Sequence, residues 1–546
     1  MKNVMILSGL LLTMLPLSVR AQKTANDTIT RNVLVESVYN PVLTSSEKRS
    51  FLPVEQPAVE HKEPIVYAFT TQTAAGYERL PIRLDGIKFN DSRVNRGFAW
   101  LGAGNRLNVD AQASYLFSLS DNDALGLGFA MEGWKGSIPY GGNNWKSNRN
   151  DMTLRADFHH KGSTSLDAGV HFGRHSFNYI LADSTAVPEF DMQKSIDYGA
   201  RATLKGIASD LSLDIPLGYT LDVAIDQWQN SYLPGLLNRS AESHLMANVA
   251  AHYDTDGKGS FCLGVNNDFL GYSGLEEYNN SYFLNINPSW QKKGRIWAAS
   301  LGLNLDTKNE LHRVVQVSPD CHFTFIPFKF MQLSLTADGG RSLQTFKDLY
   351  ALTPYWSADV QPAQAYVRLN AKAQADARLA EGLHLSGWGG IRFVADDLMV
   401  CRDTVNSLLT AGLCNTDTRA TYMGVSMAYT WKDVFRVGAE LEKTMWKADD
   451  AALLAWKPDM NLNVSARAQI FDRLHANAGI HCIRYTAVED VREPFVADVS
   501  AGADFRINKY ISVWAKGDNL LNRHYSLAPV YPSQGIRGML GVTARF

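Results

Sequence analysis

Two groupings of residues in this 546-residue chain have side chains of the types that site chemistry requires. His159 and His160 are adjacent and could be metal ligands, and Glu440 and Glu442 could form a carboxylate pair for acid–base catalysis. Adjacent residues of a strand point to opposite faces, so the two histidines cannot chelate one ion from a strand. Glu440 and Glu442 share a strand face with Arg436, which favours a charged wall of a polar interior over a catalytic pair.

The five cysteines raise the question of disulfide bonding. Cys401 and Cys414 lie in a long polar stretch, where an oxidising compartment would permit a disulfide. The alternative is that these two, together with Cys262, Cys321 and Cys482, are all unpaired thiols. The chain has no G-x-S-x-G elbow, Walker loop, H-E-x-x-H or C-x-x-C motif. The sequence therefore predicts neither an enzyme nor a cofactor.

Segments in which apolar and polar residues alternate recur from Arg96 to the C-terminus. Clear examples are residues 365–376, 461–470 and 495–506. Strict alternation is the period of a β-strand that has one face in lipid and the other toward a polar interior. A water-soluble sandwich also alternates, but its core face would carry bulkier residues than the alanines found here. The pattern therefore favours membrane-spanning strands.

The polar face of these strands carries charges of both signs. A basic residue that faced lipid near the bilayer midplane would cost roughly 2–4 kcal/mol, so these residues must face water, a ligand or packed polypeptide. We therefore predict that the following residues face the lumen: Arg155, Asp157, Arg368, Lys372, Asp376, Arg378, Arg436, Glu440, Glu442, Arg467, Asp498, Asp504 and Arg506.

The connections between the predicted strands are alternately short and long. Tight polar turns lie at residues 120–123 and 380–382, for example, whereas long loops are predicted at 137–150, 341–361 and 394–419. Outer-membrane barrels have this asymmetry, with short periplasmic turns and longer external loops. The sequence thus predicts an all-β fold, a transmembrane antiparallel up-and-down barrel of about 22 strands in the lipid of the cell outer membrane.

The chain is predicted to have three parts. Residues 1–21 combine the basic Lys2, an apolar run over 4–17 and a small-residue step, as a secretory signal peptide does. Residues 22–95 are rich in proline and charge, which predicts an extended periplasmic segment without a core of its own. Residues 96–546 form the barrel. The net charge of −2 gives no sign of a nucleic-acid partner.

The last residues of the chain resemble the closing signature of TonB-dependent receptor barrels. They are the stretch from Lys516 to Tyr525, then Tyr531-Pro532, then Gly535 to Gly538 before the final strand. In that family a strand ends in a turn similar to Asn-Leu-Phe-Asn, with a tyrosine shortly after. Leu521 stands here in place of the phenylalanine. The resemblance implies a receptor or transport barrel that binds or passes a solute across the outer membrane.

The same resemblance implies an N-terminal plug, but residues 22–95 are too few to build one. The chain is most similar to plug-less members, in which a stretch like Val35 to Val42 precedes the barrel. A bore of this width normally has an occupant. We expect the occupant to be the N-terminal segment, the inward-folded loops 341–361 and 394–419, or a partner protein.

Residues 22–95 also offer a docking segment for a periplasmic protein, for instance by pairing Thr28 to Val35 as an added strand. A non-transporting scaffold or assembly partner in the outer membrane is the alternative function. The mixed charge of the predicted lumen fits sugars, peptides and metal chelates alike, so the sequence leaves the solute open.

Overall fold

The computed structural model describes residues 96–546 apart from short gaps. The predicted signal peptide and N-terminal segment lie outside the described residues. The gaps fall at residues 141–142, 182–191, 208–216, 232–239, 256–258, 276–277, 309–313, 358–360, 362, 406–407, 433, 487–494 and 529–530.

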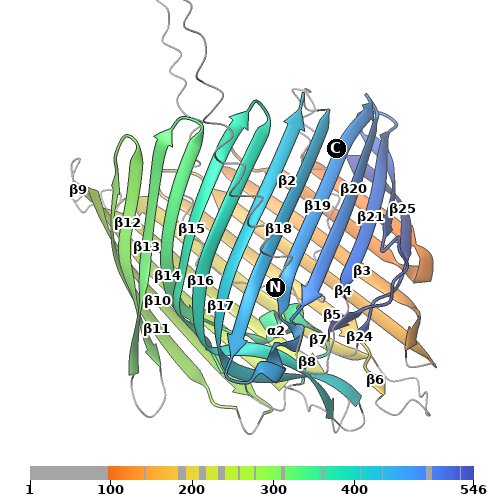
Figure 1. Cartoon of the computed structure of the whole chain (residues 1–546), viewed down its shortest axis with the longest axis horizontal. Helices are drawn as coiled ribbons and strands as arrows, with labels where there is room; N and C mark the ends of the chain where they lie inside the picture. Colours follow the sequence, from red (N-terminus) through yellow and green to blue (C-terminus); the bar gives the residue numbers. More distant parts are fainter. Residues whose placement is uncertain are drawn as a thin grey trace, which may run out of the picture. The chain divides into compact units, whose positions relative to one another are not determined.

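One closed antiparallel sheet makes up almost all of the described chain (Figure 1). It has 23 strands, of which β6 (Ile180–Leu181) pairs only with β17, so the wall itself has 22. The wall closes where β1 pairs with both β2 and β25. The predicted antiparallel barrel of about 22 strands is therefore confirmed.

The strands of the wall follow one another in chain order. Their bounds are β1 Gly97–Gly104, β2 Val109–Ser118, β3 Asp123–Tyr140, β4 Asn143–His160, β5 Ser165–Phe177, β7 Gln193–Ile207, β8 Leu217–Ser231, β9 Ser240–Thr255, β10 Gly259–Ser273, β11 Ser281–Lys293, β12 Trp297–Lys308, β13 Val314–Phe328, β14 Met331–Ser342, β15 Ala365–Ala380, β16 Leu383–Val405, β17 Leu408–Trp431, β18 Phe435–Ala448, β19 Pro458–Phe471, β20 Leu474–Tyr485, β21 Val496–Arg506, β22 Ile511–Asp518 and β25 Arg537–Arg545.

A few short elements stand outside the wall. They are β6, the pair β23 (Ser526–Ala528) and β24 (Tyr531–Pro532), the helix α2 (Phe346–Leu352), and the 3₁₀ turns η4 (Asn105–Leu107) and η6 (Ala451–Trp456). In Figure 1, α2, β6 and β24 gather at the lower end of the barrel. We call this the loop end, and the opposite end the turn end.

The outer face of the wall is apolar. Val223 and Ile225 on β8, and Met423 and Val425 on β17, are large and exposed. Asp222, next to Val223 on β8, is buried. An apolar surface that continues around a closed barrel belongs in lipid. Among the described residues, no helix is long and apolar enough to cross a membrane.

The structure has the predicted asymmetry of short turns at one end and long loops at the other, but two of the predicted loops are wrong. Turns such as 329–330 and 381–382 lie at one end, and loops such as 343–364 and 519–536 at the other. However, the predicted loops 137–150 and 394–419 are mostly strand, because the hairpins β3–β4 and β16–β17 continue far beyond the neighbouring strands. Outside the membrane both faces of a hairpin can be polar, so its backbone pairs without the alternation that the prediction relied on.

The β16–β17 hairpin leaves the wall at a row of β-bulges. The register shifts between Asp338 and Gly340 in β14, after Val367 in β15 and after Val394 in β16. Gly340, Val367 and Val394 are successive cross-strand partners, so the three shifts lie at one level. Gly340 has φ +132°, which favours glycine, and Asp396 has φ +53°. Bulges bend the strands that carry them.

The tip of this hairpin reaches the opposite wall. Leu408 and Leu409 of β17 pair with Leu181 and Ile180 of β6, which directly follows β5. Since β5 is the fifth and β17 the sixteenth of the 22 wall strands, they stand half a circumference apart. The hairpin therefore spans the bore at the loop end.

Candidate functional site

A second segment crosses the bore beside the hairpin, namely loop 343–364 with its helix α2. Thr345 caps the helix: its hydroxyl accepts from the Asp348 amide at 3.2 Å, and the Asp348 carboxylate accepts from the Thr345 amide at 3.1 Å. Phe346, Leu349 and Tyr350 are buried. Positions three and four apart share one helix face, so α2 buries an apolar stripe.

That stripe joins a hydrophobic cluster built from distant parts of the chain, which we call the mouth cluster. Tyr355 of the same loop stacks on Tyr531 of β24, with ring centroids 3.4 Å apart. The Tyr531 hydroxyl donates to the Leu409 carbonyl at the hairpin tip at 2.5 Å. The members of the mouth cluster are Phe177, Tyr179, Trp228, Tyr278, Phe346, Leu349, Tyr350, Tyr355, Trp356, Leu409 and Tyr531.

Burial in the mouth cluster has an electrostatic consequence for Tyr355. Removal from water raises the pKa of its hydroxyl to about 12, so the hydroxyl stays protonated.

The aromatic rings of the mouth cluster also stabilise it by burying apolar surface. Each ring buries about 150 Å² or more, which corresponds to roughly 4 kcal/mol of transfer free energy at about 25 cal/mol per Å². Several such rings make the mouth cluster a stable hydrophobic core at the loop end.

Carboxylates of the barrel wall hold α2 from the other side. Glu242 of β9 accepts from the Phe346 amide at 2.8 Å. Asp151 of β4 accepts from the Tyr350 hydroxyl at 2.6 Å, and Asp197 of β7 lies 3.6 Å from the Lys347 ammonium. Every polar group that α2 offers here is a donor, and every wall group is an acceptor.

His175 of β5 ties two of these carboxylates together. Its Nδ1 is 2.9 Å from Asp151 and its Nε2 is 2.9 Å from Asp197. A neutral imidazole has a single N–H, so bonding to both carboxylates requires the imidazolium form. The ring also stacks on Trp228, with centroids 5.2 Å apart, and lies 4.7 Å from Tyr350.

A buried ion pair fixes the bend of the hairpin. The Lys457 ammonium, after η6, lies 3.1 Å from the Asp397 carboxylate at the β16 bulge, and the two side chains are 5% and 2% exposed. Thr418 of β17 donates to the same carboxylate at 2.8 Å. Burial lowers the pKa of Lys457 even though Asp397 opposes that change. Breaking such a pair leaves an unpaired buried charge.

Cys401 and Cys414 lie on facing strands of the hairpin rather than in an irregular loop. Cys401 is the register partner of Gly412, and Cys414 is the partner of Met399. Their sulfur atoms are 3.2 Å apart, and both cysteines are free thiols. The structure thus brings together the two cysteines that the sequence singled out.

The lumen residues predicted on β15 to β19 belong to several small networks. The Trp388 indole donates to Glu442 at 3.2 Å, and Lys372 lies 5.5 Å from the same ring. Glu440 faces Ser426 and Asn463 across its two neighbouring strands, so the two glutamates have different partners. Asp376 accepts from Ser386 at 2.5 Å, and Arg436 is the register partner of Arg467.

The remaining predicted residues are spread over both ends. Arg155 and Asp157 are 3.8 Å apart and well exposed, and the backbone of Arg378 donates to Phe330. Arg368 lies at the β15 bulge, where the alternation slips, and pairs with Asp417 at 2.8 Å. The last three residues lie near the end of the chain. Asp504 is 4.0 Å from His475, and Arg506 donates to the Asp472 carbonyl. Asp498 accepts a hydrogen bond from the Tyr525 hydroxyl.

Sequence reasoning missed the wall residues that hold α2. The capping pattern Thr345-x-x-Asp348 with apolar positions 346, 349 and 350 could have revealed the helix.

The two adjacent histidines contact different aspartates, as expected for opposite strand faces. His159 contacts Asp167, and His160 contacts Asp123. Within the described part of the chain, no group of three or more ligands could hold a metal ion.

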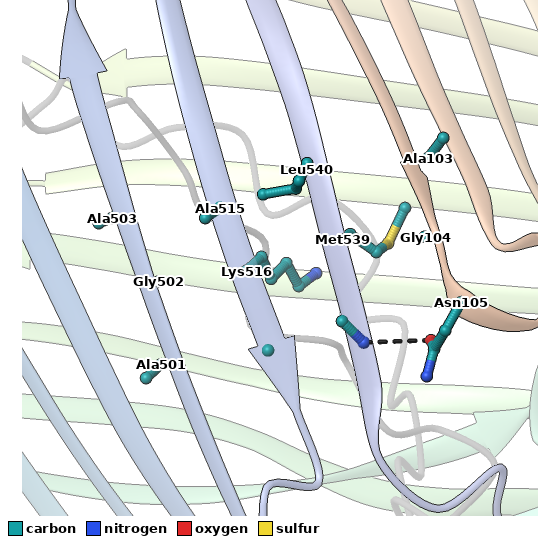
Figure 2. A pocket seen from close by; sticks show the side chains of 12 residues that line it. Ala103, Gly104, Asn105, Ala501, Gly502, Ala503, Ala515, Lys516, Met539 and Leu540 are labelled. Atoms are coloured by element: carbon teal, nitrogen blue, oxygen red, sulfur yellow. Dashed lines mark hydrogen bonds between the residues drawn. The ribbon is translucent and has the colours of Figure 1, made fainter.

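A shallow recess of about 680 Å³ lies at the seam where the barrel closes. Figure 2 shows Ala103, Ala501, Ala503 and Ala515 from three strands around it. The Gly538 amide donates to the Asn105 side chain at 3.1 Å beside it. Lys516 is its only charged lining residue, so this recess offers little for recognition compared with the α2 contacts.

Several solved structures share this fold. The FrpB iron transporter of Neisseria meningitidis is 10% identical, with a TM-score of 0.63 over 83% of this chain and 82% of that one. A mutant of the ferric enterobactin receptor PfeA of Pseudomonas aeruginosa is 10% identical, with a TM-score of 0.62 over 84% and 81%. The ferric-catecholate import receptor Fiu of E. coli K12 is 9% identical, with a TM-score of 0.59 over 83% and 82%.

No family model and no curated protein matches the sequence. At about one identical residue in ten, the structural likeness shows the fold alone. The resemblance to TonB-dependent receptor barrels, predicted from the C-terminal residues, is confirmed at that level. The barrel fold and its apolar outer face together agree with the predicted location in the outer membrane.

Proposed function

We propose that the protein is a receptor-type transport barrel that binds a solute outside the cell and passes it across the outer membrane. The mouth cluster is the observation that carries the proposal: segments from opposite walls meet over the bore and bury their aromatic residues against each other. A barrel closed by removable loops, with a polar wall behind them, is suited to gated passage. The related fold of receptors and transporters supports a transport role and not an enzymatic one.

Planar-bilayer conductance tests this proposal. Ser342 and Ala365 are cross-strand partners, so a short turn can replace loop 343–364 without disturbing the wall. We expect the intact barrel to be nearly silent and the loop-less barrel to conduct in large steps. Silence of both barrels, and of a barrel that also lacks residues 22–78, would contradict a transport function and favour a scaffold.

The N-terminal segment requires a separate test, because residues 22–95 are our second candidate for closing the bore. We propose that they are an extended periplasmic segment that docks a periplasmic protein. A barrel lacking residues 22–78 should still insert into the membrane and should remain silent. If this deletion opened the bore while loop removal did not, the N-terminal segment and not the mouth cluster would be the closure.

A further inference from the structure

The wall contacts of α2 have the composition of a ligand-binding site. The site, which we call the α2 site, consists of Asp151, His175, Asp197, Trp228 and Glu242 from five wall strands. It presents three carboxylates and an aromatic platform on one side of the bore. All five residues lie on rigid strands, which is the arrangement that keeps a site in place when its occupant leaves.

The polar half of the site recognises donors. The Asp197 side chain is 7% exposed and lies 3.6 Å from the Lys347 ammonium. Glu242 is 3% exposed and accepts from a backbone amide of α2. With α2 withdrawn, Glu242 would lose this backbone donor. Asp197 would lose the Lys347 ammonium and keep His175 at 2.9 Å and His171 at 3.2 Å. The vacated site would then hold the same wall carboxylates with one positive charge and one donor fewer, so it would favour a new cation with N–H groups.

The apolar half recognises a ring. Tyr350 packs 5.2 Å from Trp228 and 4.7 Å from His175, and its hydroxyl donates to Asp151 at 2.6 Å. Arg149 already neutralises Asp151 at 2.7 Å and lies 5.9 Å from the Tyr350 ring. The cation that the vacated site lacks is therefore the one that Lys347 supplies at Asp197.

We propose that α2 is an internal pseudo-ligand, and that the solute taken by the α2 site carries an aromatic ring and a primary ammonium group. This inference rests on the proposed transport function and names its substrate class. Because α2 is tethered, it competes at a high effective concentration. A solute therefore gains entry only by replacing the same contacts, and its binding releases the loop that closes the mouth.

A peptide with the sequence of α2 is the direct probe. The peptide Phe-Lys-Asp-Leu-Tyr-Ala-Leu, with blocked ends, is titrated into the loop-less barrel described above while tryptophan fluorescence and binding heat are measured; tyramine serves as a small competitor. We expect saturable binding to the loop-less barrel and none to the intact one. Loss of one charge-assisted contact should weaken binding roughly tenfold or more.

Two changes locate the contact. Asp197→Asn in the loop-less barrel, and separately Lys347→Glu in the peptide, should each weaken binding, whereas Asp376→Asn on the distant strand β15 should leave it unchanged. Equal binding of the two peptides, or no binding at all, would overturn the inference. If the loop-less barrel fails to fold, the full chain carrying Lys347→Ala and Tyr350→Ala replaces it, since these changes release α2 without shortening the loop.

The same preparation separates this inference from the proposed function. If the loop-less barrel conducts but does not bind the peptide, the substrate class is wrong and transport stands. If it binds the peptide but never conducts, the site is real and the transport function is wrong.

Discussion

On strands β4 and β7, inward-facing charged residues near the loop end are buried or half-buried, whereas those farther toward the turn end are exposed. Near the loop end, Asp197 of β7 is 7% exposed and held by His175 and Lys347. Near the turn end of the same strand and of β4, Arg201 is 54% and Arg155 is 70% exposed. The alternation of inward-facing and outward-facing residues along β4 and β7 is the same near the loop end and near the turn end. What differs is the pair of segments that crosses the bore at the loop end.

The contrast shows that the contribution of a charged residue to stability depends on whether polypeptide covers it, and not on its chemical type. An ion pair between exposed groups contributes little to stability because water and salt screen it. The same pair becomes indispensable once polypeptide covers it, because breaking it leaves an unsolvated charge. The covered charges of the loop end should therefore be sensitive to single substitutions, and the exposed charges of β4 and β7 nearer the turn end should be tolerant of them.

The largest effect is expected at the buried pair that fixes the hairpin. Lys457→Met leaves Asp397 buried without its ammonium and should destabilise the loop end by about 3–5 kcal/mol. Protease sensitivity of the β16–β17 hairpin in the inserted barrel measures the loss. The double variant Asp397→Asn, Lys457→Met removes both charges and should recover much of the resistance; if it is as sensitive as the single variant, an unpaired charge is not the cause.

Removal of one ring from the mouth cluster should come next. Trp356 is fully buried between the hairpin and α2, so Trp356→Ala should cost about 3–5 kcal/mol locally and open the bore part of the time. Conductance and sensitivity to large antibiotics should both rise. Trp431, which is half exposed at the turn end, is the matched control. A similar rise with Trp431→Ala would show that the mouth cluster has no special part in closure.

The cysteine pair offers a smaller and opposite change. We propose that Cys401 and Cys414 form a disulfide upon oxidation, since their sulfur atoms are already 3.2 Å apart. A disulfide closing a short loop stabilises by roughly 2–3 kcal/mol, so oxidised protein should have a more protease-resistant hairpin. Alkylation followed by mass spectrometry reports the bond. Resistance that is unchanged in Cys401→Ser under the same oxidant would contradict this role.

The smallest effect is expected at the turn end. Arg155→Ala removes an exposed ion pair with Asp157 and should change barrel stability by less than about 1 kcal/mol. Thermal unfolding in detergent, followed by circular dichroism, is the measurement. A loss as large as that of Lys457→Met would mean that something covers Arg155 in the membrane, and the contrast between the two ends would disappear.

The wall was predictable from the sequence because its rules are local. Alternation with period two marks each strand, turn residues mark each reversal, and the parity of loop lengths tells one end from the other. These signals held even for β15 and β19, whose bounds of Ala365–Ala380 and Pro458–Phe471 agree closely with the predicted strands. They failed for the part of the β16–β17 hairpin past the β16 bulge, which lies beyond the wall and needs no apolar face.

The site was decided only by the tertiary structure. Tyr350 and Asp151 are 199 residues apart in the chain, and Tyr531 and Leu409 are 122 apart. No local period reports such contacts. They exist because a row of bulges turns one part of the wall over the bore, toward strands half a circumference away. The sequence predicted which residues face inward, and the crossing of the bore decided which residues of the loop end are buried and paired.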